Sequence, residues 1–172
     1  MAAFAIDSRI GLNVSDAPVT TPVWAVGQRT TMSDGTIWVY CAVPISTSVR
    51  QYDCCGITGT ASVVPVTSTI GLRGVGEVIC QQTVTSDSVN IQYLWMLAAN
   101  PMGNTTYKCR VAASAAIDAK LATTAFAGTL DDTTAGTVQR VDGIVLTDSQ
   151  PAGSSGSRTF RTATPGLTFD AV

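Results

Sequence analysis

The chain consists of short apolar runs separated by turn-forming residues, and this spacing limits the possible folds more than any other feature of the sequence. Short runs rich in β-branched and aromatic residues are typical of antiparallel sandwiches and barrels. Thr and Val supply roughly a quarter of the 172 residues, and both favour strands. The sequence therefore predicts a mainly β fold, a compact β-sandwich or β-barrel-like domain of short antiparallel strands. The expected strands are residues 23–26, 37–43, 61–66, 75–80, 89–96, 107–112 and 138–146.

The segments between these runs are rich in Gly, Asn, Asp and Pro, which supply the backbone conformations that turns require. We expect an irregular tail after residue 150, because its first residues have the same turn-forming composition. The expected turns are residues 33–35, 53–56, 71–74, 100–103 and 151–156.

One segment, residues 112–122, has a different character. It is rich in alanine, and Ile117 and Leu121 are four residues apart, as on one face of a short helix. The pattern fits a helical turn and an extended loop about equally well, and neither changes the predicted class.

The first 22 residues are predicted to form an extended N-terminal arm. Ala17-Pro18 and Thr21-Pro22 prevent helix continuation and bias the preceding residues toward extended backbone. Such an arm can add a strand to a neighbouring subunit, although a first strand packed on its own domain fits the pattern equally well. The β-rich domain then covers residues 23–172, including the irregular C-terminal tail. The side chains expected at the interface are Phe4, Ile6, Ile10, Leu12, Val14 and Trp24.

The aromatic side chains are the expected anchors of the core. Trp38, Tyr40 and Trp95 lie within predicted strands, and large apolar side chains contribute most to core packing. Trp24 lies at the junction between the arm and the domain, where it could fasten the arm to a neighbouring subunit.

Charge and hydropathy exclude two kinds of partner. Only 13% of the residues are charged and the net charge is −2, so we expect no broad basic surface for nucleic acid. No apolar run approaches the roughly 18 residues that cross a bilayer, and the N-terminus lacks the basic flank of a secretion signal, so we expect no membrane partner. An apolar content of 45% suggests that another subunit covers part of the surface, although many small Ala and Val residues could also account for it.

Catalytic chemistry is not expected. The chain has no histidine, which is the commonest general base and transition-metal ligand. The neighbouring Asp131 and Asp132 would point to opposite faces of an extended backbone, which favours turn capping over a weak cation site. We therefore predict no enzymatic activity, no cofactor and no metal site.

The five cysteines are predicted to be small buried hydrophobes. Their number is odd, their spacing is not that of a metal site, and no neighbouring His or Lys would stabilise a thiolate at the adjacent pair Cys54-Cys55. The five residues are Cys41, Cys54, Cys55, Cys80 and Cys109.

Several short elements occur in an order that resembles the head-decoration, or capsid-cement, proteins of tailed bacteriophages. The chain departs from that family in the Cys54-Cys55 pair, a polar insertion at residues 83–90, the tail beyond residue 150 and the arm before Pro22. The elements that carry the resemblance are Ser33-Asp34-Gly35, Trp38-Val39-Tyr40, Gln51-Tyr52-Asp53, Arg73-Gly74-Val75-Gly76, Tyr93-Leu94-Trp95, Val111-Ala112-Ala113-Ser114, residues 121–132 and residues 141–147.

The resemblance implies a structural virion protein. Such a protein is made in the cytoplasm of the bacterial host, docks on the outer surface of the capsid and cements neighbouring major-capsid subunits. It implies the major capsid protein as partner and a homo-oligomer, a dimer or a trimer, on the particle. Two other functions fit a β-rich chain of this kind: a tail or head-fibre component, and a carbohydrate- or ligand-binding module that uses exposed tryptophans.

Overall fold

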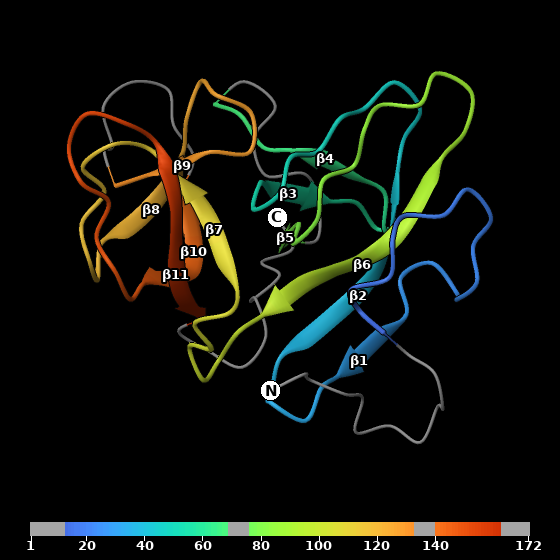
Figure 1. The fold of residues 1–172 in the computed structure, drawn as a ribbon, viewed down its shortest axis with the longest axis horizontal. Helices are drawn as coiled ribbons and strands as arrows, with labels where there is room; N and C mark the ends of the chain where they lie inside the picture. Colours follow the sequence, from blue (N-terminus) through green and yellow to red (C-terminus); the bar gives the residue numbers. More distant parts are fainter. Residues whose placement is uncertain (1–12, 69–75, 133–139, 163–172) are drawn as a thin grey trace.

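The computed structural model describes residues 13–68, 76–132 and 140–162, and these residues form eleven β-strands in two sheets. Strands β1 to β6 make the first sheet and strands β7 to β11 make the second, so each sheet is continuous in the sequence. Figure 1 shows them side by side, the second sheet on the left and the first on the right. The predicted mainly β fold is confirmed. The described residues contain no helix that could cross a membrane.

The first sheet has the strand order β1-β2-β6-β5-β3-β4. Its centre is the long antiparallel pair β2–β6, in which Tyr40 lies opposite Trp95. Both strands are apolar along most of their length because both of their faces are buried. The bounds are β1 Arg29–Thr31, β2 Ile37–Val43, β3 Cys54–Ile57, β4 Val63–Pro65, β5 Gly76–Ile79 and β6 Gln92–Ala99.

This sheet curls until its two ends meet on β2. Strand β1 pairs with the first half of β2, and the segment just before β4 reaches the second half. There the N–H of Ala42 donates to the carbonyl of Ala61 at 2.9 Å, and Ala42 forms a parallel bridge with Ser62. Alternate side chains of β2 and β6 fill the enclosed core: Val39, Cys41, Val43, Leu94, Met96 and Ala98.

The second sheet is a closed barrel in the order β10-β11-β7-β9-β8. All neighbouring pairs are antiparallel except β7 and β9, which are parallel through Val111 and Leu130. A ring of five strands cannot alternate in direction throughout, so closure forces one parallel pair into an otherwise antiparallel sheet. The bounds are β7 Lys108–Val111, β8 Lys120–Thr123, β9 Leu130–Asp131, β10 Arg140–Leu146 and β11 Gly156–Thr162.

A second core fills the barrel and continues into the space between the sheets. It unites barrel side chains with the opposite face of the first sheet, where Trp38, Tyr40 and Trp95 lie. Burial of this apolar surface from both sides is the main force holding the two sheets together. The barrel contributes Cys109, Val111, Leu121, Leu130, Val141, Ile144, Leu146 and Phe160.

The sequence predicts a turn at residues 53–56, but this prediction is wrong because Cys54–Ile57 form strand β3. The strand is paired on both edges, with β5 and with β4. Cys54 packs into the core between the sheets and Cys55 into the core of the first sheet. A short strand buried on both faces lacks the polar alternation that would distinguish it from a turn containing glycine.

The irregular tail expected after residue 150 is also corrected, because Gly156–Thr162 form β11 between β7 and β10. The strand is mostly polar because its first four residues are only half-buried, and Phe160 supplies its main buried anchor. The alternative of a helix at residues 112–122 is excluded. Turns occupy its first part, with left-handed backbone at Ser114 and Asp118 (φ 68° and 58°), and β8 begins at Lys120.

The expected strand at residues 23–26 is likewise absent, and the first strand begins at Arg29. Residues 13–24, here called the strap, instead cross β6. Val19 and Tyr93 exchange both backbone hydrogen bonds, at 3.0 and 2.8 Å. Val14 is only 5% exposed and belongs to the core between the sheets.

The described part of the predicted arm therefore packs on its own domain, as in the alternative of a first strand on the same chain. The remaining part of the arm, residues 1–12, lies outside the described residues. Four of the predicted interface side chains fall there: Phe4, Ile6, Ile10 and Leu12.

Candidate binding site at the seam between the sheets

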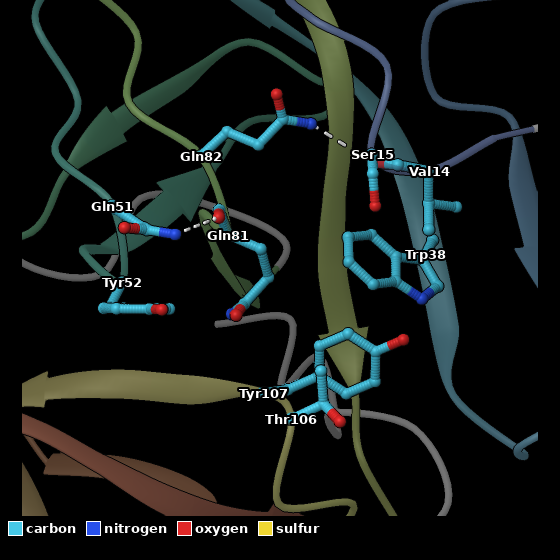
Figure 2. A pocket seen from close by; sticks show the side chains of 9 residues that line it. All are labelled: Val14, Ser15, Trp38, Gln51, Tyr52, Gln81, Gln82, Thr106 and Tyr107. Carbon is cyan, nitrogen blue, oxygen red and sulfur yellow. Dashed lines mark hydrogen bonds between the residues drawn. The ribbon is translucent and has the colours of Figure 1, made fainter. Parts of the chain in front are cut away.

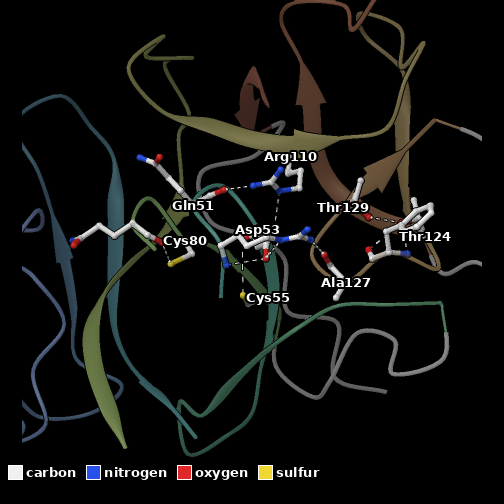
Figure 3. A network of polar contacts seen from close by, with 11 residues as sticks. Gln51, Asp53, Cys55, Cys80, Arg110, Thr124, Ala127 and Thr129 are labelled. Carbon is white, nitrogen blue, oxygen red and sulfur yellow. Dashed lines mark hydrogen bonds and ion pairs between the residues drawn. The ribbon is translucent and has the colours of Figure 1, made fainter. Parts of the chain in front are cut away.

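A buried carboxylate, Asp53, joins the two sheets (Figure 3). Asp53 immediately precedes β3, and its side chain is only 2% exposed. Its Oδ1 accepts a hydrogen bond from Nε of Arg110 in β7 at 2.9 Å, so the ion pair crosses from one sheet to the other. Its Oδ2 accepts from the backbone N–H of Arg50 at 3.0 Å and lies 3.3 Å from the Nε of that residue. Asp53, Arg50 and Arg110 are called the Asp53 clamp below.

Backbone hydrogen bonds continue the clamp. The N–H of Arg110 donates to the carbonyl of Tyr52 at 2.8 Å, and Nη2 of the same arginine donates to the carbonyl of Gln51 at 3.0 Å. Arg110 thereby fixes the three consecutive residues 51–53. A buried charge with this many partners keeps its hydrogen-bonding capacity satisfied, which is the condition for retaining it between two apolar cores.

The loop between β8 and β9 packs against the other side of the same carboxylate. The N–H of Cys54 donates to the carbonyl of Gly128 at 2.9 Å, and Arg50 Nη2 donates to the carbonyl of Ala127. Gly128 has φ +71°, and a Cβ atom there would lie 2.3 Å from Cγ of Asp53. Only glycine fits this close approach.

A pocket of about 260 Å³ opens at the seam, beside the clamp (Figure 2). Its walls come from three parts of the chain: the strap, the first sheet with its loops, and the segment leading into β7. The close-up shows the side chains of Tyr52, Gln81, Ser15 and Tyr107 around the open space. Every lining side chain is uncharged: Val14, Ser15, Trp38, Gln51, Tyr52, Gln81, Gln82, Thr106 and Tyr107.

Hydrogen bonds hold the glutamines of this seam pocket in place. Gln81 pairs with the backbone of Lys108, donating to its carbonyl at 2.9 Å and accepting from its N–H at 3.3 Å. Gln51 donates to the carbonyl of Gln81 at 3.0 Å. Gln82 donates to the carbonyls of Val14 and Asp16 in the strap, at 3.3 and 2.9 Å. The amides are therefore oriented before any ligand arrives.

Tyr52 occupies a left-handed backbone conformation, with φ 72°, at the edge of the seam pocket. A bulky residue in this region carries strain, which the surroundings must hold in place. Here the N–H of Tyr52 donates to the carbonyl of Cys80 at 2.6 Å while its carbonyl accepts from Arg110. The conformation places the Tyr52 ring beside the pocket.

A second pocket, of about 380 Å³, lies under the strap on the aromatic face of β2 and β6. Tyr40 is central to its wall, with ring centroids 5.2 Å from Trp95 and 6.3 Å from Tyr93. The ring of Trp24 packs on that of Trp95, with ring centroids 6.2 Å apart. The lining is mainly apolar, and Trp95 Nε1 is buried without a hydrogen-bond acceptor among the described residues.

The predicted anchors and interface residues can now be placed. Trp38, Tyr40 and Trp95 are 1%, 2% and 3% exposed and lie in the core between the sheets. Trp24 is half-buried and contacts its own chain, and Val14 lies in the core rather than on the surface. The sequence analysis did not identify the residues of the seam pocket as a site. One signal was present: the polar pair Gln81-Gln82 directly follows an apolar run, which indicates a strand end where polar side chains can gather.

Exposed apolar side chains gather at the far end of the first sheet, where β2 ends and β6 begins. Ile45, Val89 and Ile91 are 51%, 77% and 41% exposed. Their loops are joined, since the N–H of Ser46 donates to the carbonyl of Asp87 at 2.6 Å. These three residues are called the apolar tip.

All five cysteines are free and buried, as predicted. Burial raises the pKa of Cys80 and of Cys109 to about 12, and it raises the pKa of the other three thiols as well. A thiol with so high a pKa is neutral at physiological pH and is a poor nucleophile or metal ligand.

The acidic pair Asp131-Asp132 accepts backbone hydrogen bonds. Asp132 Oδ2 accepts from the N–H of Ala116 at 2.9 Å, and Asp131 Oδ1 accepts from the N–H of Asp132 at 2.8 Å. No cluster of three or more potential metal ligands occurs in the described part of the chain.

Searches with protein-family models, against curated proteins and against solved structures found no match to this chain. The described residues offer two features suited to non-covalent binding: the neutral, preorganised seam pocket and the exposed apolar tip.

Proposed function

We propose that the protein is a structural component of a phage particle that docks on the outer surface of the capsid and cements neighbouring major-capsid subunits. The observation that carries the proposal is the order of the elements that resemble head-decoration proteins. Trp38-Val39-Tyr40 falls in β2, Tyr93-Leu94-Trp95 in β6, and Gln51-Tyr52-Asp53 leads into the Asp53 clamp. The buried members of these three elements contribute to the fold: Trp38, Val39, Tyr40, Asp53, Leu94 and Trp95.

A cement protein must resist deformation while many copies hold a shell together. The Asp53 clamp and the shared apolar core supply that rigidity, because they tie the two sheets through both charge and packing. Each docking contact can be modest, since occupancy of many equivalent sites stabilises the assembled shell by mass action.

The apolar tip is the proposed capsid contact. Val89 lies within residues 83–90, the insertion that departs from the family pattern, and contacts specific to one shell belong in such divergent loops. Exposed apolar side chains that become buried on docking contribute most of the affinity of an interface. The major capsid protein is the proposed partner, and residues 1–12 are proposed to reach a neighbouring copy in a dimer or trimer.

The test is retention on heads assembled without this chain. Purified protein is mixed with such heads, and the bound fraction is measured by sedimentation. We expect wild-type protein to bind and Val89→Asp to bind at least about tenfold more weakly, because a charge would have to be buried at the contact. Ile117→Asp, at a 53% exposed position in the turn before β8, is the matched control.

Two results would count against this function. Absence of wild-type binding to heads would reject the docking role itself. Equal loss with Val89→Asp and Ile117→Asp would reject the apolar tip as the contact.

A further inference from the structure

We propose that the seam pocket binds one ring of a neutral saccharide. This goes beyond the capsid role and does not depend on it, because the isolated chain carries the complete pocket. The proposal rests on the lining of the pocket, its preorganisation and the hydrogen-bonding capacity that remains unused in it.

The first argument is electrostatic. No charged side chain lines the pocket, although Asp53 and Arg110 lie just behind its wall with their charges already paired. A phosphate, a carboxylate ligand or a cation would enter without a compensating charge, at a high desolvation cost. The chemistry therefore favours an uncharged ligand.

The second argument is the unused hydrogen-bonding capacity. Among the described residues, the hydroxyls of Ser15, Tyr52 and Thr106 have no partner, and Gln51 Oε1 accepts no hydrogen bond. Hydroxyls both donate and accept, and an amide oxygen accepts. A ligand that presents several adjacent hydroxyl groups matches this set.

The third argument is the shape and apolar part of the wall. Tyr107 and Tyr52, both half-buried, are the accessible rings of the wall, and Tyr107 is held edge to face against the buried Trp38 with ring centroids 5.4 Å apart. A pyranose ring has one face of C–H groups that packs on aromatic carbon while its hydroxyls reach polar groups at the rim. A volume of about 260 Å³ lies just below the usual range for drug-sized ligands and suits a single ring rather than an extended peptide.

The site is also built in advance. Gln51, Gln81 and Gln82 are each held by hydrogen bonds to backbone groups, and Tyr52 is held in its left-handed conformation by Cys80 and Arg110. Groups fixed before binding lose little entropy when the ligand arrives.

The other pocket is a weaker candidate for a saccharide. Trp24 and Trp95 pack on each other there, and Trp95 is only 3% exposed. The unpaired Trp95 Nε1 is itself buried, so it offers no accessible donor to a ligand in this pocket.

The experiment uses the full chain and a panel of neutral mono- and oligosaccharides built from glucose, galactose and N-acetylhexosamines, with uronic acids as charged probes. Binding is followed by calorimetry and by the backbone amide resonances of Gln51, Gln81 and Thr106. We expect at least one neutral saccharide to bind and to shift these resonances, with the uronic acids binding more weakly.

Conservative variants then locate the site. Tyr52→Phe and Thr106→Val each remove one hydroxyl and are expected to weaken binding about three- to tenfold. Tyr93→Phe, in the pocket under the strap, and Thr105→Val, at an exposed neighbouring position, are the matched controls and should bind as wild type.

The proposal is overturned if no neutral saccharide binds to the folded protein, or if uronic acids bind equally well. It is also overturned if Tyr93→Phe weakens binding while Tyr52→Phe and Thr106→Val do not, because the ligand would then lie under the strap. Retention on capsids is measured separately with the same variants, so failure of the saccharide site and failure of the docking role give different results.

Discussion

Asp53 Oδ1 lies 2.9 Å from Arg110 Nε, and this ion pair connects the segment before β3 in the first sheet to β7 in the barrel. The carboxylate is almost completely buried while Arg110 is 26% exposed. The pair therefore sits at the boundary between the core and the surface, where its charge is only weakly screened by solvent.

Asp53→Asn is expected to lower the free energy of unfolding by about 3 kcal/mol, because it leaves two arginines facing a neutral amide at a buried site. Equilibrium denaturation in urea measures the change. Asp148→Asn, which removes a 60% exposed partner of Arg158, is the control and should cost less than about 0.5 kcal/mol. Similar losses in the two variants would contradict the structural role of the clamp.

Gly128→Ala is expected to lower the free energy of unfolding by at least about 2 kcal/mol, because the new Cβ atom would overlap the Asp53 side chain and the residue would keep a positive φ. Gly153→Ala separates these two causes, since Gly153 also has a positive φ (+101°) but a Cβ atom there would meet nothing within 4 Å. Gly153→Ala should lower the free energy of unfolding by about 1 kcal/mol, from backbone strain alone. Equal midpoints of thermal unfolding for the two variants would show that the overlap is relieved at no cost.

The clamp illustrates which parts of the fold the sequence could predict. Strand β2 is long and apolar, and its predicted range, residues 37–43, agrees with the structure. Strand β3 was missed because it is short, contains Gly56 and is buried on both faces by cysteines, so neither periodicity nor composition distinguishes it from a turn. Such a strand is specified by its neighbours rather than by its own residues.

The seam pocket shows the same limit for the site. Gln51-Tyr52-Asp53 was recognisable as an element, but nothing local indicates that Arg110, far along the chain, closes on it. The sequence of the strap likewise fits a free arm and a strand on its own domain equally well, because its apolar residues and prolines do not reveal that Val14 enters the core or that Val19 pairs with Tyr93.

The raised pKa values of the buried thiols lead us to expect a loss of stability at alkaline pH. Burial raises the pKa of Cys80 and Cys109 from 9.0 to about 12, so the folded state holds protons that the unfolded state releases. The stabilisation by the neutral thiols is complete below about pH 9 and is lost as the pH rises toward about 12. Burial raises the pKa of Tyr40 and Tyr107 in the same direction. The thermal midpoint measured from pH 7 upward should therefore fall above about pH 9. A midpoint that rises across this range would contradict the argument.

The same burial makes the cysteines unreactive. At about pH 8 a thiol reagent should label none of the five in the folded protein and all five in denaturant, because labelling requires an exposed thiolate. A reducing agent should leave the thermal midpoint unchanged. Rapid labelling of native protein, or a large drop in the midpoint on reduction, would contradict the assignment of the cysteines as packing residues.

Truncation tests the strap. Removal of residues 1–21 is expected to destabilise the domain by about 2–4 kcal/mol, since it takes Val14 out of the core and removes the backbone pair between Val19 and Tyr93. Removal of residues 1–12 leaves these contacts in place and isolates any contribution of the proposed arm to capsid retention. The two truncations are compared by urea denaturation and by sedimentation with heads.

If the longer deletion unfolds at the wild-type urea concentration, the strap is not part of the folded domain. If the shorter one is retained on heads as well as the full chain, residues 1–12 contribute nothing to retention, and the proposed contact of the arm with a neighbouring copy is rejected.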